Sequence, residues 1–425
     1  MRVSQKPGIS IIVIALCFIA CIFIFVGFSF NVETTDIEDM SVPLCDGEDY
    51  VTPEMYGAVG DGVTDDSDAI NNALQSGFPV MLSAKTYLCH KSIRMPSGAE
   101  LYGEGSASVL YNDVKWGYDK NVIIAGLANS RENAGSSLTV NKYLVTGDRT
   151  GTSFAVDNAS SSFSVGDVVL FTDGSKIQES DACRAYRYMD AAKVTEVGDD
   201  LVTVDSTITN NKVLEGAELY IVNFSDISDI YSSEFGGYLY IADNVKVHDL
   251  TIQLQYPEEG SGMYAIYCNC IDSSFERINF VNVSTPVGSN AFIRSALKDC
   301  NATYAGGITD MAEIQIRSTY ENLTYERMGH NSNHQYEGFV ISNGYGCSAA
   351  NIDINNGDMA GAYRCCYMYD ITFTNCTYTS SCTPEQGQWV FFTNPVDDTI
   401  YLIDCYNYSD LPLYSSPCYV SYTFE

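Results

Sequence analysis

The sequence predicts an all-β solenoid with a short helix near its N-terminus, a small β insertion and a leading transmembrane helix. Three observations support this fold class. An apolar run opens the chain, short segments with alternating apolar residues recur through its second half, and a hairpin-like pattern interrupts them. The expected regions are a signal anchor at 1–30, an acidic stalk at 31–49, the N-terminal cap and first coils at 50–138, an inserted β subdomain at 139–222 and the main coils at 223–425.

The apolar run covers residues 9–30 and contains no charged side chain. It is long enough to cross a bilayer as a helix. Arg2 and Lys6 precede it and an acidic stretch follows, which favours a cytoplasmic N-terminus and an exported body. A cleaved secretory signal usually has a shorter apolar core that ends at small residues. We therefore expect an uncleaved single-pass anchor and an extracellular body at the cell surface, or a secreted body if the segment is cleaved.

The composition narrows the class of partner. The chain has 54 acidic and 22 basic residues, a net charge of −32. Such a chain repels nucleic acid and other polyanions, so no nucleic-acid partner is expected. Neutral sugars stay open as ligands, as does Ca²⁺ at the acidic surface, and no other cofactor is expected. Seven Asn-x-Ser/Thr sites fit an exported glycoprotein.

Cysteine usage points away from zinc. Thirteen of the 15 cysteines follow the apolar run, and none forms paired Cys-x-x-Cys knuckles with histidines. Disulfides and buried thiols are both open for an exported chain. Because thirteen is an odd number, at least one cysteine stays unpaired or pairs between molecules, which leaves a homo-oligomer open.

The stretch "YGAVGDGVTDDSDAI", residues 56–70, predicts a turn followed by a helix. Its glycines permit a tight turn after a short strand at residues 51–56. Apolar residues at 69, 70, 73 and 74 then recur at helical spacing until Gly77. Residues 64–67 supply side-chain oxygens where a helix N-terminus needs caps. We favour this structural role for the aspartates over a calcium or catalytic site.

This stretch, with "FPVMLSAKTYLC" and "SIRMPSGAELYGEG" after it, resembles the N-terminal signature of the pectate-lyase-like superfamily. The resemblance covers about residues 50–110. That superfamily includes rhamnogalacturonase-type enzymes and phage tailspikes. The resemblance implies a right-handed parallel β-helix, with a helix at residues 66–76 that caps the open N-terminal end of the coil. It also implies that the chain, if active, is a polysaccharide hydrolase or lyase.

The second half of the chain supports a coil independently. Short segments with two inward apolar residues recur at steps of 28, 22, 23, 29, 19 and 32 residues, in the range of a β solenoid repeat. The segments are Leu250/Ile252, Ile278/Phe280, Cys300/Ala302, Leu323/Tyr325, Ile352/Ile354, Ile371/Phe373 and Ile403/Cys405.

An asparagine stands two residues after four of these segments and predicts an internal ladder. Asparagine tolerates left-handed backbone, and stacked amides can bond to one another. The predicted members are Asn282, Asn356, Asn375 and Asn407. Asn301 and Asn322 precede inward residues, so we expect both to face outward, open to modification.

Residues 139–222 break the coil pattern. "SFSVGDVVLFTDGS" and "AAKVTEVGDDLVTVDSTI" alternate apolar and polar residues, with Gly-Asp at the turns. This pattern is typical of antiparallel hairpins. The segment resembles the small β insertion of some members of the same superfamily.

The candidate catalytic residues are Glu326, His330, Asp353 and Asp358, which fall on neighbouring turns of the proposed coil. Carboxylates and imidazoles can move protons in glycoside cleavage. Asp353 belongs to Asn351-Ile-Asp-Ile, in which the apolar residues point inward and the polar ones outward. The alternatives without a catalytic role are that Asp353 and Asp358 are solvated surface acids, and that the stretch around Glu326 and His330 is a surface loop between coils. The Gly-His-Gly and Arg-x-Lys motifs of polygalacturonase-type hydrolases are absent from the expected positions.

Substrate contacts are expected from the same stretch, "YENLTYERMGHNSNHQYEG". Tyr320, Tyr325 and Tyr336 would stack on sugar faces, and Arg327 would supply a cation. The overall expectation is a membrane-anchored extracellular β-helix that binds polysaccharide, with cleavage inferred from the resemblance alone. The alternative is a non-enzymatic adhesin or a self-assembling cell-envelope protein. Carboxylates about 5–10 Å apart beside exposed aromatic rings would favour hydrolysis.

Overall fold

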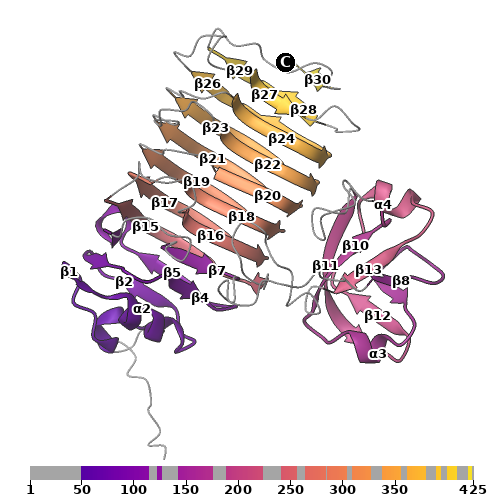
Figure 1. The fold of residues 1–425 in the computed structure, drawn as a ribbon, viewed down its shortest axis with the longest axis horizontal. Helices are drawn as coiled ribbons and strands as arrows, with labels where there is room; N and C mark the ends of the chain where they lie inside the picture. Colours follow the sequence, from indigo (N-terminus) through magenta and orange to yellow (C-terminus); the bar gives the residue numbers. More distant parts are fainter. Residues whose placement is uncertain are drawn as a thin grey trace, which may run out of the picture. The chain divides into compact units, whose positions relative to one another are not determined.

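The computed structural model describes residues 49–113, 122–126, 142–175, 188–223, 241–255, 264–283, 285–303, 309–326, 337–355, 361–379, 389–393, 400–408 and 420–423. Figure 1 shows successive strands stacked in coils, and a smaller sheet formed by an insertion. Within these ranges no helix is long and apolar enough to cross a membrane. The N-terminal transmembrane helix of the expected fold class is therefore not supported, and the described fold is all-β without it. Residues 9–30, where that helix was expected, lie outside the described residues.

A long parallel sheet carries one strand from most coils. In order it contains β1 (Asp61–Asp65), β3 (Thr86–Leu88), β6 (Val109–Asn112), β15 (Lys246–Leu254), β17 (Ser274–Val281), β19 (Ala296–Thr303), β21 (Thr319–Glu326), β23 (Ser348–Asn355), β25 (Ile371–Thr374), β28 (Ile400–Ile403) and β30 (Val420–Thr423). Four strands join it beside this path: β2 (Val80–Leu82), β5 (Glu100–Gly103), β26 (Thr377–Thr379) and β29 (Tyr406–Asn407).

A second parallel sheet carries the other strand of each coil. It contains β4 (Ile93–Met95), β7 (Ile123–Ala125), β14 (Ala242–Asp243), β16 (Tyr264–Ile271), β18 (Thr285–Ile293), β20 (Thr309–Ile316), β22 (Glu337–Tyr345), β24 (Gly361–Tyr369) and β27 (Trp389–Thr393). Each coil thus pairs with the next one in both sheets. This pairing confirms the parallel β-helix that the sequence predicted.

The core consists of inward side chains stacked in columns. One column is Val247, Phe275, Leu297, Tyr320, Ala349, Phe373 and Leu402, all at most 3% exposed. Another is Leu250, Ile278, Cys300, Leu323, Ile352, Cys376 and Cys405. Burying each large apolar side chain contributes about 1.5–3 kcal/mol before the entropy of ordering the chain is counted.

The second column corrects the last two predicted repeats. Its first five members open predicted segments, as expected. Phe373, however, lies opposite Ala349 in the first column. Strand β25 ends at Thr374, the chain turns at Asn375, and Cys376 continues the second column before β26. The apolar alternation alone did not reveal this turn.

Each of the seven coils from β15 to β28 turns at one residue between the two columns. There, two consecutive outward residues lie between an inward residue of the first column and an inward residue of the second column. The second of these outward residues has φ between 50° and 57°. These left-handed residues are Asp249, Arg277, Asp299, Asn322, Asn351, Asn375 and Asp404. Six of the seven are Asp or Asn, the non-glycine residues that tolerate this conformation best.

Their side chains form an exposed ladder instead of the predicted internal one. The Asn322 amide donates to Asp299 (2.7 Å), Asn351 to Asn322 (2.8 Å) and Asn375 to Asn351 (2.8 Å). Asn375 is therefore a ladder member, but so is Asn322, which the sequence placed apart from the ladder. Asn282 belongs to a different turn, where its amide donates to the Leu254 carbonyl (2.9 Å). Asn407 lies in β29, and Asn356 lies outside the described residues.

A second corner joins the two sheets and contains a buried serine stack. Residues with φ between 47° and 63° turn the chain at Asn244, Asp272, Arg294, Arg317, Gly346 and Asp370. The hydroxyls of Ser273, Ser295 and Ser318, directly after three of these turns, donate to backbone carbonyls. The Ser273 and Ser295 hydroxyls also accept from N–H groups of the preceding coil. The stack satisfies polar groups that burial would otherwise leave unpaired.

The seven cysteines whose side chains the structure describes are buried thiols. Cys89, Cys268, Cys270, Cys300, Cys347, Cys376 and Cys405 are all free. This finding supports the thiol alternative, and no disulfide is present among these residues. Burial raises the pKa of Cys300 and of Cys347 to about 12, since a thiolate would lose its hydration.

The N-terminal turn uses its aspartates for structure. The Asp66 carboxylate accepts the N–H groups of Val59 and Gly60 at 2.7 and 3.1 Å. Asp61 accepts those of Val63 and Thr64. Residues Pro53–Tyr56 form a 3₁₀ turn where we expected a strand, because Pro53 at its first position favours a turn.

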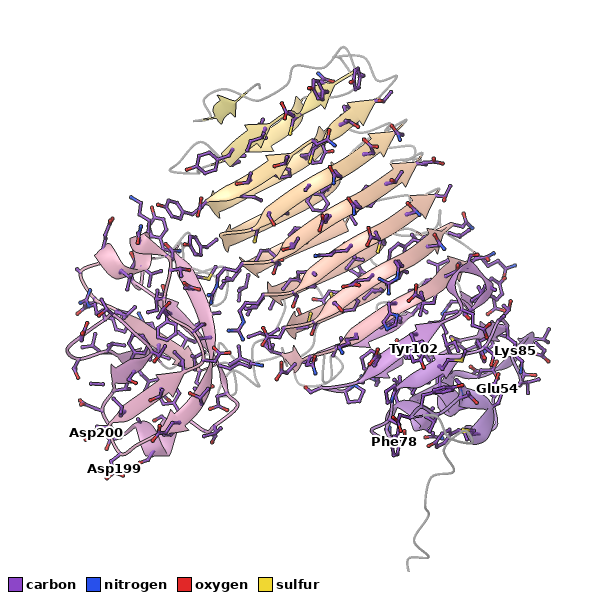
Figure 2. The ribbon with its side chains drawn as sticks, turned by 180° about the vertical axis from the view of Figure 1, so that it is seen from behind. Glu54, Phe78, Lys85, Tyr102, Asp199 and Asp200 are labelled. Carbon is purple, nitrogen blue, oxygen red and sulfur yellow. The ribbon has the colours of Figure 1, made fainter. Side chains whose placement is uncertain are left out.

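Helix α2 (Ser67–Leu74) covers the end of the second sheet. Strand β4 is the last strand there, so its edge would expose unpaired backbone groups. The Asn71 side chain on α2 donates to the Ser92 carbonyl (3.1 Å) and accepts the Arg94 N–H (2.8 Å). Beside it, Glu54 and Lys85, labelled in Figure 2, form an ion pair at 2.9 Å.

The insertion is a six-stranded antiparallel sheet within the segment where hairpins were expected. Its strands are β8 (Lys142–Leu144), β9 (Ser153–Ala155), β10 (Val168–Thr172), β11 (Met189–Val197), β12 (Leu201–Val204) and β13 (Tyr220–Asn223), with short helices α3 (Ala159–Ser162) and α4 (Asn211–Glu215). Its own apolar core includes Phe154, Phe171 and Ile221.

Ion pairs attach the insertion to the corner between the sheets. Arg294 binds Asp205 of the insertion (2.8 Å) and Asp272 of the coil (2.6 Å). Arg317 binds Asp190 (3.0 Å), a carboxylate that is 1% exposed. Because a buried carboxylate needs partners, this pair adds to the hydrogen bonds that Asp190 accepts from the Thr209 and Asn210 N–H groups.

The exposed ladder predicts different effects for two substitutions of Asn351. Alanine removes the ladder hydrogen bonds and places a β-carbon in left-handed backbone, which should lower the free energy of unfolding by about 1–3 kcal/mol. Glycine loses the same hydrogen bonds without that strain, so its loss should be smaller. Urea unfolding of both variants, with Thr324→Ala as an outward control on extended backbone, measures the difference. Equal losses for alanine and glycine would show that the backbone conformation contributes nothing.

Candidate functional site

Two outward rows run across the long sheet beyond the left-handed turn. The first row is Thr251, Asn279, Asn301, Thr324, Asp353, Thr377 and Tyr406. The second is Gln253, Val281, Thr303, Glu326, Asn355 and Thr379. Because parallel strands are spaced about 4.8 Å apart, each row advances by that distance per coil.

Glu326 and Asp353 are the two predicted catalytic residues that the structure describes. Glu326 is exposed at the end of β21, and Asp353 is half-buried on β23. Asp353 lies opposite Thr324, whereas Glu326 lies opposite Asn355, so the two acids are diagonal neighbours on one face. The strand spacing and the rise of two residues place their Cα atoms about 8 Å apart.

Thr377 fixes one of these carboxylates. Its hydroxyl donates to Asp353 Oδ1 from the next coil. The contact holds the Asp353 side chain toward β26. Among the described residues no such hydrogen bond orients Glu326, so the pair combines a held acid with an exposed one.

Two of the three predicted substrate-binding tyrosines are buried. Tyr320 is 0% exposed and its hydroxyl donates to Gln315 inside the coil (2.9 Å), while Tyr325 is 3% exposed. Both rings pack in the core, so neither offers a face to a sugar, which corrects their expected role. Arg327, His330, Tyr336 and Asp358 lie outside the described residues, and their roles stay predictions.

Sequence reasoning missed a polar cluster around His248. On β15 its ring contacts Asp249 (2.7 Å) and Glu100 of β5 (3.0 Å), and it stacks on Tyr102, labelled in Figure 2. Arg277 donates to both oxygens of Asp249 at 2.7 and 2.8 Å. The pair His248-Asp249 directly before an inward leucine was a usable signal, but Glu100 lies 148 residues away in sequence.

Arg277 and His248 change the acidity of Asp249. The guanidinium bonds, followed by the bond to His248, lower the pKa of Asp249 to about 2. Both nitrogens of His248 are engaged, so this cluster holds coils together more readily than it moves protons to a ligand. Nowhere in the described ranges do three or more His, Cys, Asp or Glu side chains gather in a way that could hold a metal ion.

The comparisons with known proteins agree with the N-terminal motif. Residues 54–144 match the family described as "Rhamnogalacturonase A/epimerase, pectate lyase-like". This segment carries the pectate-lyase-like signature. The preneck appendage protein of Bacillus phage PZA is 42% identical over 60 residues, which are 14% of this chain and 7% of that protein. The match thus spans a small part of that relative.

Solved structures show weaker likeness over more of the chain. The gp42 tailspike of Acinetobacter phage vb_AbaP_AS12 has a TM-score of 0.47 and 12% identity, covering 87% of this chain and 47% of that one. An alginate lyase from Paenibacillus sp. str. FPU-7 has a TM-score of 0.41 and 8% identity, covering 84% of this chain and 97% of that one.

The low pKa of Asp249 predicts a pH-dependent contribution to stability. A carboxyl group whose folded pKa lies below its unfolded value of about 3.9 stabilises the fold above that pH. The contribution is lost as the pH falls from about 4 toward 2. Asp249→Asn keeps a side chain suited to left-handed backbone but lacks the charge. The melting temperature of wild type should therefore exceed that of the variant at pH 6, and the gap should narrow between pH 4 and pH 2.

Asp299→Asn is the matched control, because Asp299 occupies the same turn in another coil. A difference in melting temperature between wild type and Asp249→Asn that stays constant from pH 6 to pH 2 would contradict the low pKa of Asp249.

Proposed function

We propose that this protein binds polysaccharide along the two outward rows and hydrolyses it with Glu326 and Asp353. The observation that carries the proposal is the diagonal placement of the two acids on one exposed face. A Cα separation of about 8 Å is compatible with the carboxyl separation of about 6.5–9.5 Å used by inverting glycosidases. The match of residues 54–144 to a family named for rhamnogalacturonase A supports a polysaccharide as the ligand.

The two acids take different roles. Glu326, exposed at the end of β21, donates a proton to the glycosidic oxygen as the bond from the anomeric carbon breaks. Asp353, oriented by Thr377, accepts a proton from the water whose oxygen forms the new bond to that carbon. One water is consumed and one new reducing end appears for each bond cleaved.

The N-terminal signature and the acidic composition support an inference about where this activity takes place. A 60-residue stretch of this chain is 42% identical to the preneck appendage proteins of Bacillus phages PZA and phi29. We infer that the protein acts at an exposed surface, where an acidic chain meets polysaccharide and not nucleic acid.

The test uses the full chain and a panel of neutral glucans, with rhamnogalacturonan and alginate as anionic polymers that the acidic chain should disfavour. Wild type should release new reducing ends from at least one of them. Asp353→Asn and Glu326→Gln should each lower the rate about 100-fold or more, because each removes a proton-transfer group. Their melting temperatures should stay near that of wild type, since both side chains face outward.

Glu321→Gln is the matched control. Glu321 is an outward carboxylate on the same strand, but it pairs with Lys298 (3.3 Å) on the other side of the turn. It should retain full activity. Binding without new reducing ends would favour the adhesin alternative, and full activity in both acid variants would remove this pair from consideration.

A further inference from the structure

The last described coils expose two tyrosines that the proposed chemistry does not use. Tyr406 is 44% exposed and Tyr408 is 65% exposed. Their rings are nearly parallel, with an interplanar angle of 19° and centroids 6.3 Å apart. Large aromatic side chains usually gain from burial, so two such rings side by side on a sheet face suit a ligand with an apolar surface.

Both tyrosines continue the rows that contain the acid pair. Tyr406 lies opposite Thr377, which lies opposite Asp353, so it stands two strands from that acid. The Tyr408 N–H donates to the Tyr378 carbonyl (2.8 Å), which extends the second row beyond Thr379. At the usual strand spacing, Tyr406 lies about 10 Å from Asp353 and Tyr408 about 14 Å from Glu326.

The surface between the acids and the rings consists of short polar side chains. Thr377 follows Asp353 in one row, and Asn355 and Thr379 follow Glu326 in the other. Threonine and asparagine side chains are shorter than tyrosine, so the rings stand above this floor. A sugar chain lying on it would meet hydroxyl and amide groups and then the two exposed aromatic rings.

We propose that Tyr406 and Tyr408 form a sugar-binding subsite, and that the polysaccharide runs along the rows from the acid pair to these rings. The ligand is a pyranose unit, whose apolar C–H face packs on a tyrosine ring. The direction of the chain is therefore across the strands, from coil to coil. The position of the cleaved bond rests on the proposed function, whereas the binding at the tyrosines is measured separately.

The test measures dissociation constants by calorimetry in an Asp353→Asn background, which prevents turnover. The probes are cellohexaose, maltohexaose and a rhamnogalacturonan hexasaccharide. Tyr406→Ala and Tyr408→Ala should each weaken binding of at least one probe roughly 3- to 10-fold, the size of an aromatic contact. Tyr406→Phe should restore most of the affinity, because it keeps the ring.

Tyr401→Ala is the matched control, since Tyr401 is 36% exposed on β28 but lies on the other side of the turn. It should leave affinity unchanged. Thr379→Trp tests the path, because a large side chain on the floor should obstruct a chain that crosses it. Circular dichroism and melting temperatures confirm that each variant is folded.

The outcomes separate this subsite from the proposed hydrolysis. Equal affinity in wild type, Tyr406→Ala and Tyr408→Ala would overturn the subsite, even if Asp353→Asn abolishes cleavage. The same losses in Tyr401→Ala, or no binding of any probe, would also overturn it. Tyrosine-dependent binding with no cleavage by wild type would support the subsite and remove the hydrolysis.

Discussion

The left-handed residue in each coil from β15 to β28 is the constraint on which the rest of the structure depends. It places two consecutive outward side chains between two inward ones, so the inward–outward alternation of side chains shifts by one residue at this point. Alternate residues after it therefore face outward, in the two rows that carry Asp353 and Glu326. Without that turn, strict alternation would reverse which side chains beyond it face the core.

The identity of the turn residue also determines how the coils are tied together. Aspartate and asparagine combine tolerance of left-handed backbone with groups that bond the next coil, as in Asn322 and Asn351. Arg277 lacks that tolerance but occupies the same place, held by Asp249. In this coil an ion pair therefore ties the turn to the neighbouring coil, as amide hydrogen bonds do in later coils.

The sequence was sufficient for the coil, but not for the side-chain columns, and the expected transmembrane helix is not supported by the described residues. Apolar spacing and the N-terminal glycines identified the coil and its cap, because both are local patterns. The asparagine ladder was placed in the wrong column, since Asn282 and Asn375 occupy different turns that look alike in sequence. Tyr320 and Tyr325 looked like ligand contacts because nothing local distinguishes a tyrosine in the core from one on the surface.

The site was predictable to a similar degree. Asp353 was recognised as outward from its position between two apolar residues. Its partner Thr377, its diagonal relation to Glu326 and its row-mate Tyr406 depend on which residues pair between coils. That register is fixed by loop lengths and turns, which a single chain's periodicity does not contain. The contact of Glu100 with His248 is hidden for the same reason, because the insertion separates them.

The buried thiols give each part of the coil its own chemical reporter. Cys300, Cys347, Cys376 and Cys405 lie on four different coils, and a protonated thiol in the core does not react with an alkylating reagent. Each becomes reactive only when its own coil opens to solvent. The relative rates at which the natural cysteines are alkylated therefore report the order in which the coils open, without any engineered label.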